Sequence, residues 1–234
     1  MLGLVVNTLA IVVGGVIGLL AKKGVPDTWN DQIMKALGFG VLFIGITGLG
    51  KGGNPMIVII SMVIGTIIGI VLKLDHRVNN IGIILENKFA KGEEHGKFSE
   101  GFVTASILFC AGAMAIIASL EAGLNGNNEM LFTKSIMDFV PSVLLASTLG
   151  AGVIFAAAMV FVYQGFFILT AGFFAPYLST AVTNEISVLG SLLLVAMCFN
   201  VIGLGKFKIM NMVPAVFMPI VLVPLFDWIG SVNL

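Results

Sequence analysis

The sequence predicts an all-α integral membrane protein with about eight transmembrane helices and an inverted structural repeat. Of its 234 residues, 58% are apolar and only 10% are charged, whereas soluble domains carry about 25% charged residues. The apolar residues also fall into long runs, and two sets of three runs resemble each other. This composition excludes a water-soluble globule, a disordered chain and a disulfide-stapled secreted domain. Lys plus Arg and Asp plus Glu number 12 each, so no basic field points to nucleic acid.

Seven apolar runs approach the roughly 20 residues that a helix needs to cross a bilayer. They are residues 4–20, 33–49, 56–72, 102–120, 153–175, 186–204 and 212–229. The first run lacks a preceding Lys or Arg and a small-residue cleavage pattern, so we expect it to stay as a membrane helix. An eighth run, 136–149, would be only about 21 Å long as a helix. It is therefore either a tilted crossing or a half-helix that turns back.

The distribution of Lys and Arg predicts the orientation. If all eight runs cross and the N-terminus is outside, ten cationic residues lie inside and only Lys51 and Lys134 lie outside, as the positive-inside rule favours. The inner ten are Lys22, Lys23, Lys35, Lys73, Arg77, Lys88, Lys91, Lys97, Lys206 and Lys208. If the short run does not cross, the split falls to eight and four. We therefore expect both termini outside.

Residues 75–100 are the one substantial polar segment. Apolar residues recur in it at helical spacing, at positions 78, 81, 85 and 89, while Glu86 lies off that stripe. This pattern predicts a short amphipathic helix on the inner membrane surface. Its two histidines, His76 and His95, have no accompanying ligand cluster, so we expect no metal site.

A repeated motif divides the chain. The segment ITGLGK at 46–51 recurs as VIGLGK at 201–206, and a proline, Pro55 or Pro214, follows each copy. Pro26 and Pro176 occupy similar places in the preceding loops. The alternative is that GLGK is a generic helix end followed by a snorkelling lysine.

The repeat predicts one polytopic domain, 1–234, built from two related units. The first unit is 1–74, the segment 75–100 follows, helices within 101–151 link the halves, and the second unit is 152–234. Helices 1–3 would match helices 6–8 in opposite orientation, an architecture that many secondary transporters use for alternating access. We therefore expect a transporter of a small solute or ion. The alternatives are an oligomeric channel and a membrane scaffold or regulatory protein.

No enzyme signature such as HExxH or GxSxG occurs, so the sequence predicts no catalytic activity and no cofactor. The lipid bilayer and an unidentified small solute or ion are the expected partners, and a homo-oligomer stays open. Two GxxxG pairs, Gly14/Gly18 and Gly65/Gly69, predict close helix packing within the first half.

Ionisable residues near membrane depth are the first candidate site, because charge in hydrocarbon is costly. Glu121 closes the fourth predicted helix, and Lys134, Ser135 and Asp138 open the short fifth one. On the eight-crossing arrangement all four lie near the outer surface. Asp138 and Glu121 would accept a cation or proton, with Lys134 as their counter-charge. Alternatively, Ser135 and Asp138 form a capping box.

Polar residues deeper in the predicted spans are the second candidate group. They either line a path or hydrogen-bond between helices. These residues are Tyr163, Gln164, Asn200, Ser147 and Thr148, with Asn7 and Thr8 entering the first span. Two membrane prolines, Pro141 and Pro219, each free a backbone carbonyl and favour a broken helix or a cavity.

Several motifs together resemble a known family. They are FCAGAMAI at 109–116, KSxxD at 134–138, LASTLGAGV at 145–153, YQG at 163–165 and GVLFIGITGL at 40–49. With them the chain resembles, over nearly its full length, the bacterial YqgA/YdfK-like membrane proteins, a family defined as a domain of unknown function. The resemblance implies a multi-pass protein of the bacterial inner membrane and a transporter role, without a substrate. It draws attention to Lys134, Ser135, Asp138 and Gln164.

Overall fold

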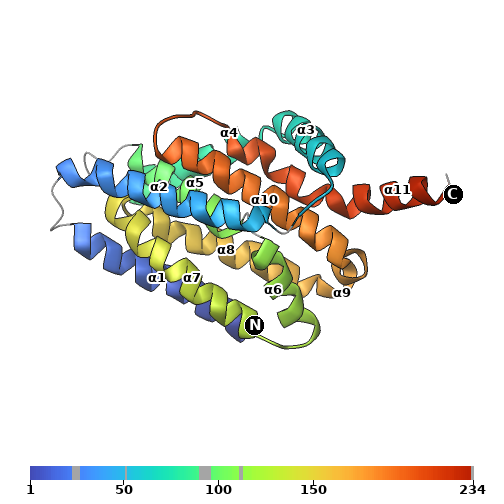
Figure 1. Cartoon of the computed structure of the whole chain (residues 1–234). Coiled ribbons are helices and arrows are strands. Elements are labelled where there is room, and N and C mark those ends of the chain that lie inside the picture. Colours follow the sequence, from blue (N-terminus) through green and yellow to red (C-terminus); the bar gives the residue numbers. More distant parts are fainter. Residues whose placement is uncertain (23–26, 51, 90–95, 111–112, 233–234) are drawn as a thin grey trace.

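The computed structural model describes residues 1–22, 27–50, 52–89, 96–110 and 113–232, and every regular element in them is helical. The α-helices are α1 (Leu2–Lys22), α2 (Asp27–Leu49), α3 (Pro55–Val71), α4 (Leu74–Phe89), α5 (Lys97–Cys110), α6 (Ala113–Leu124), α7 (Glu129–Leu149), α8 (Gly152–Leu169), α9 (Ala171–Phe174), α10 (Thr180–Val201) and α11 (Pro219–Val232). Two 3-10 helices, η1 (Ala175–Tyr177) and η2 (Ile209–Phe217), join them. Figure 1 shows the long helices side by side and α11 projecting from one end of the bundle. The predicted features at Lys23, Pro26, Lys51, Lys91 and His95 lie outside the described residues.

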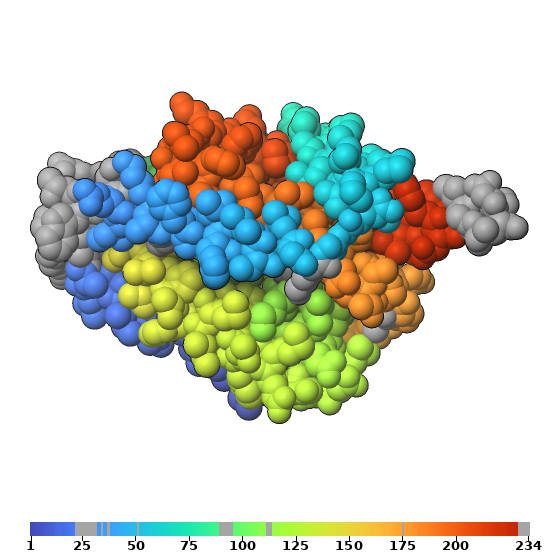
Figure 2. Space-filling model, in the orientation of Figure 1, coloured from blue at the N-terminus to red at the C-terminus, as the bar shows by residue number. Residues whose placement is uncertain are grey.

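Within the described residues, four helices are long and apolar enough to cross a membrane, namely α1, α7, α8 and α10. Three bent pairs, α3 with α4, α5 with α6, and η2 with α11, raise that number to seven if each pair is one span. The apolar part of α2, Gly38–Leu49, is shorter than a span. Large apolar side chains are widely exposed, including Phe43 at 69% and Ile59 at 62%. Figure 2 shows α2 lying across one face between α7 and the C-terminal segments.

The predicted short run 136–149 is part of a longer helix, because α7 begins seven residues earlier, at Glu129. Its 21 residues span about 31 Å at 1.5 Å per residue, enough to cross the apolar core. The predicted run stops at Ile136, just after Lys134 and Ser135, but the helix continues through Lys134, whose charge pairs with that of Asp138 one turn further on. The half-helix alternative was therefore wrong, and Pro141 lies inside a continuous helix.

Two predicted single spans are broken. The run 102–120 is divided between α5 and α6, which are bent by 60° relative to each other. The last run is divided between η2 and α11, bent by 43°. Pro214 lies inside η2, and Pro219 begins α11. Because proline has no N–H and fixes its φ, it favours such breaks, which confirms the expectation for Pro219.

α1 lies against α7 and runs parallel to it. A Cβ on Gly3 would lie 2.7 Å from Leu131 Cβ, and one on Gly18 would lie 2.9 Å from Ala146 Cβ. Both contacts join residues 128 positions apart, so the two helices advance in the same direction. Only glycine at these positions lets the two backbones approach so closely.

Three other neighbouring pairs run antiparallel: α1 with α8, α2 with α10, and α3 with η2. In each pair, as the residue number rises along one element, the residue number of its contact in the other element falls. The contacts that fix these directions are Gly15 with Ile154, Gly165 with Leu4, Gly38 with Ile202, Gly48 with Ser191, Gly65 with Ala215 and Gly69 with Asn211. Each element near the start of the chain therefore packs against a partner from its last third.

The two GxxxG pairs do not pack within the first half. A Cβ on Gly14 would lie 2.0 Å from Ser142 Oγ on α7, and one on Gly69 would lie 2.0 Å from the Asn211 carbonyl oxygen on η2. The prediction of close packing was correct, but the partners come from further along the chain. A local sequence pattern indicates a close approach without identifying which helix approaches.

Candidate functional site

A buried ion pair lies at the centre of α7. Lys134 and Asp138 are one turn apart, and Lys134 Nζ lies 2.5 Å from Asp138 Oδ2. Both residues are buried, at 5% and 6% exposure. Asp138 is the tenth residue of α7, which places it about 14 Å from the start of the helix. The prediction that Lys134, Ser135 and Asp138 open this helix was therefore wrong, because α7 begins at Glu129.

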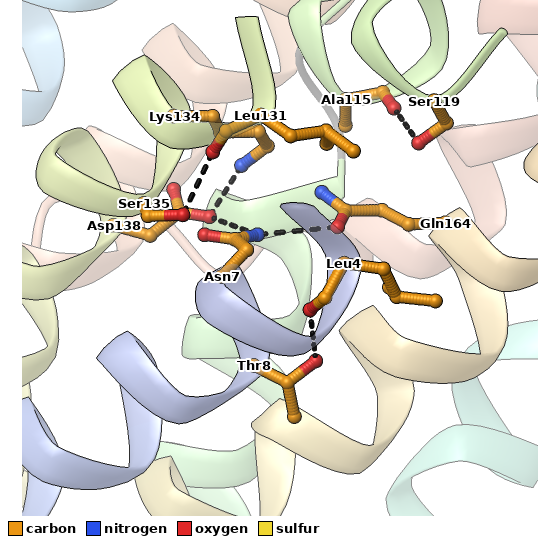
Figure 3. A network of polar contacts seen from close by, with 10 residues as sticks. All are labelled: Leu4, Asn7, Thr8, Ala115, Ser119, Leu131, Lys134, Ser135, Asp138 and Gln164. Carbon is orange, nitrogen blue, oxygen red and sulfur yellow. Dashed lines mark hydrogen bonds and ion pairs between the residues drawn. The ribbon is translucent and has the colours of Figure 1, made fainter. Parts of the chain in front are cut away.

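Two amide side chains extend the ion pair into a network. Asn7 on α1 donates from Nδ2 to Asp138 Oδ2 and to Gln164 Oε1 on α8, each at 3.2 Å. Figure 3 shows Asn7 lying between Asp138 and Gln164. Asn7 and Gln164 are both fully buried. The site therefore joins three helices through side chains that the sequence separates by more than 100 residues.

The polar cluster, defined as Asn7, Lys134, Asp138 and Gln164, has spare hydrogen-bonding capacity. Asn7 Oδ1 and Gln164 Nε2 are buried without a hydrogen-bond partner in the described part of the chain. Buried polar atoms are almost always paired with protein groups or water. This carbonyl oxygen and this amide N–H beside an ion pair are therefore the groups that a small polar guest or a water molecule would use.

A small pocket opens on the ion pair. Its volume is about 130 Å³, and Lys134 and Asp138 are the charged residues in its lining. The remaining walls are apolar side chains of α2, α5, α6, α7 and α10: Ile44, Leu108, Phe109, Met114, Ala115, Met137, Pro141 and Leu194. The charged atoms thus face a small space with apolar walls.

The three hydroxyl residues predicted on α7 bond to their own helix. Ser135 Oγ donates to the Leu131 carbonyl at 2.7 Å, and Ser147 Oγ donates to the Leu144 carbonyl at 2.8 Å. Thr148 Oγ1 donates to the Leu145 carbonyl at 3.0 Å. Ser135 and Asp138 do not form a capping box, because they lie inside α7 and its N-cap residue is Asn128.

The other predicted site residues lie apart from the polar cluster. Glu121 is half-buried near the end of α6 and, within the described residues, makes no hydrogen bond or ion pair with the cluster. Tyr163 packs edge-on against Phe167 with ring centroids 5.1 Å apart. Asn200 holds the turn after α10, because it exchanges two 2.8 Å hydrogen bonds with the backbone of Phe207.

A larger pocket, which sequence reasoning missed, lies between α4, α5 and the end of α10. It has a volume of about 560 Å³. We call it the acidic pocket, because Asp75, Glu86 and Glu100 line it and no Lys or Arg is among its described lining residues. Asn79, Ser99, Thr104 and Asn200 add further polar groups.

The acidic pocket forms because α4 turns its small and polar face toward α5. Ser99 Oγ donates to Asn79 Oδ1 at 3.1 Å, and a Cβ on Gly82 would lie 2.6 Å from Ser99 Oγ. Glu86, expected on the exposed side, is only 4% exposed and accepts a hydrogen bond from the Gly96 N–H. The pocket could have been predicted from the spacing of Asp75, Asn79 and Glu86, which places them on one side of a helix. The sequence-based prediction rested instead on the apolar stripe of this helix.

Helices long and apolar enough to span a bilayer, with charged residues buried among them, define an integral membrane protein. The family model described as "Protein of unknown function (DUF554)" matches residues 2–224, and the chain belongs to this family. It is 34% identical over 227 residues to the "Uncharacterized membrane protein YdfK" of Bacillus subtilis (strain 168), covering 95% of this chain and 96% of the relative. It is 27% identical over 217 residues to the "Uncharacterized protein YqgA" of Escherichia coli (strain K12), covering 92% of each chain. No solved structure matches the chain. The resemblance recognised from the motifs is confirmed.

Proposed function

We propose that this protein carries a small solute or ion across the bacterial inner membrane, with the polar cluster as its site. The observation that carries the proposal is the Lys134–Asp138 pair, buried at the centre of a membrane helix. Charged groups inside membrane proteins are costly and mark substrate or ion pathways. The proposal assigns no enzymatic activity to the chain.

Alternating access requires two units that move against each other, and the packing supports two such units. The antiparallel pairs α1/α8, α2/α10 and α3/η2 are those that a pseudo-twofold axis in the membrane plane would relate. The units would be 1–74 and 152–234, as the repeated GLGK motif predicts. Inverted-repeat transporters place their substrate at the repeat interface, near the midplane.

The polar cluster contains residues from both proposed units. Asn7 belongs to the first and Gln164 to the second, and their side chains touch directly at 3.2 Å. Lys134 and Asp138 come from the linking helix α7. Rocking one unit against the other would therefore change the Asn7–Gln164 contact. The hydrogen bonding at the polar cluster would then depend on how the two units are arranged.

We also propose eight crossings with both termini outside, in which α2 is the eighth span. Alternate crossings make α1 and α7 parallel and α1 and α8 antiparallel, and their contacts have these directions. In this orientation the acidic pocket lies on the cytoplasmic side, where the cationic residues between the spans would also lie.

Flux into proteoliposomes tests the proposal. Wild type, Asp138→Asn and Gln164→Ala are compared for uptake of Na⁺, of Rb⁺ as a tracer for K⁺, and of protons by an internal dye, each normalised to folded protein. The matched control is Glu129→Gln, which neutralises an exposed acid on the same helix. We expect the control to keep wild-type flux and both site variants to lose at least tenfold.

The dependence of flux on cargo concentration separates the carrier from the channel. A carrier that alternates saturates at a fixed turnover, whereas an open pore conducts in proportion to the gradient. Equal flux in all four proteins would remove the polar cluster from the path.

A further inference from the structure

We infer that Asp138 is the binding position for a small monovalent cation and that Lys134 takes the place of this cation in the conformation seen here. The inference deepens the proposed function by naming the class of ion, and it rests on that proposal for the ion's movement. It is carried by the oxygen atoms around Asp138, by the charge of the pair and by the pocket beside it.

The atoms around Asp138 suit a hard cation. The Asp138 carboxylate contacts the Asn7 side chain directly, because Asn7 Nδ2 donates to Asp138 Oδ2 at 3.2 Å (Figure 3). Asn7 is fully buried, and its Oδ1 has no hydrogen-bond partner among the described residues. Carboxylate and amide oxygens are the usual ligands of hard cations. An unpartnered carbonyl oxygen beside a carboxylate is therefore what a bound cation would use.

The charge of the site selects a monovalent ion. Asp138 supplies one negative charge, and Lys134 balances it at 2.5 Å. In a buried site two cations on one carboxylate repel strongly, so cation and ammonium exclude each other. A divalent ion in place of the ammonium would leave an uncompensated positive charge. A monovalent ion leaves the carboxylate neutralised, as it is now.

The pocket of about 130 Å³ gives the displaced lysine somewhere to go. Both Lys134 and Asp138 line it. The ammonium can therefore leave Asp138 Oδ2 by a change of side-chain rotamer, without unfolding α7. Cation binding and release of Lys134 then become one exchange step at the junction of the two units, in which Lys134 gives up one proton to the solution so that the site keeps its balance of charge.

The acidic pocket provides a route that favours cations. Its lining residues include Ile107 on α5 and Met197 on α10, while Leu108 and Leu194 on the same two helices line the pocket at the ion pair. A partition of side chains from α5 and α10 thus separates the two spaces. Three carboxylates in a pocket with low-dielectric walls raise the local cation concentration.

Thermal unfolding of the purified protein in detergent tests the inference, with Na⁺, Li⁺ or K⁺ compared against N-methylglucamine at constant ionic strength. Lys134→Ala leaves Asp138 without its internal cation, so we expect a small cation at ten times its dissociation constant to raise Tm by about 3–6 °C. Wild type should show a smaller rise, because the cation must first displace Lys134. Lys134→Ala/Asp138→Asn is the matched control and should show none.

Each result supports or overturns the inference. If Lys134→Ala unfolds on purification, Lys134→Gln replaces it, because the amide keeps a hydrogen bond to Asp138 while removing the charge. The inference would be overturned if Lys134→Ala had the same Tm in all four salts. It would also be overturned if cations raised the Tm of Lys134→Ala/Asp138→Asn as much as that of Lys134→Ala. Cation stabilisation without flux would leave the binding position standing and remove transport. Flux of Na⁺, Rb⁺ or protons without any rise in Tm would leave transport standing and remove Asp138 as the cation-binding position.

Discussion

Lys134 Nζ and Asp138 Oδ2 are 2.5 Å apart on consecutive turns of α7, and less than a tenth of either side chain is exposed. The cost of removing both charges from water is of the same order as their attraction, so such a pair adds little net stability. Removing one partner is different, because the remaining charge stays buried and uncompensated. Substituting only Lys134 or only Asp138 therefore destabilises the protein by leaving the other charge buried and unpaired.

Asp138→Asn should lower the free energy of unfolding by about 3–5 kcal/mol, because it leaves the Lys134 ammonium buried alone. Lys134→Met/Asp138→Leu should recover most of that loss, since both charges are gone and the volume is filled. Denaturant unfolding in detergent measures both. The recovered double variant should still lack flux. If it is as unstable as Asp138→Asn, packing rather than charge holds this part of α7.

The contact between Asn7 and Gln164 should show energetic coupling. Asn7→Ala removes the donor that reaches both Asp138 and Gln164, and Gln164→Leu removes the acceptor on α8. A double-mutant cycle on unfolding should give a coupling of about 0.6–2 kcal/mol, the range of hydrogen bonds between membrane helices. A coupling of zero would mean that the two amides do not stabilise each other across α1 and α8.

Hydrophobic thickness predicted the class of fold and most helix positions, because every membrane helix must bury its backbone polar groups within its own length. It failed on α7, where the predicted run began at Ile136 but the helix begins at Glu129. The count of apolar residues was ended by the polar step Lys134–Ser135. Two opposite charges one turn apart neutralise each other, and only a three-dimensional contact shows that they do.

The candidate site was predicted in part for the same reason. Asp138, Lys134 and Gln164 could be selected because ionisable and amide groups are rare in apolar runs. Their partner Asn7 lies in a different span, and the sequence does not show which spans are neighbours. Ser147 and Thr148 were selected by the same rule, but their hydroxyls are satisfied by carbonyls of their own helix. A composition rule cannot separate these cases, since short hydroxyl side chains reach the backbone and longer amides reach another helix.

Gly14→Ala should destabilise the α1–α7 contact by about 1–3 kcal/mol, the usual cost of overpacking. Its Cβ would lie 2.0 Å from Ser142 Oγ and 2.7 Å from the Phe139 carbonyl oxygen, which belongs to backbone and cannot move aside alone. The control is Gly40→Ala on α2, where nothing lies within 4 Å of the new Cβ. It should be neutral or stabilising, because alanine favours a helix more than glycine does. Equal effects on Tm would show that α1 does not approach α7 at Gly14.

Ile107→Ala should open the partition between the acidic pocket and the ion pair. Cys110 lies about one turn beyond Ile107 on α5 and is half-buried, and it directly follows Leu108 and Phe109, which line the pocket at the ion pair. In a Cys198→Ala background, a membrane-impermeant cationic methanethiosulfonate applied from the side of α4 should label Cys110 at least tenfold faster in Ile107→Ala than in its parent. An anionic reagent should gain much less, since Asp75, Glu86 and Glu100 repel it. Val103→Ala is the matched control, because it enlarges the same pocket one turn before Ile107 on α5, further along the helix from Cys110, and should leave the labelling rate unchanged. If Ile107→Ala also leaves it unchanged, the acidic pocket does not lead to the ion pair, and the cation must reach Asp138 by another route.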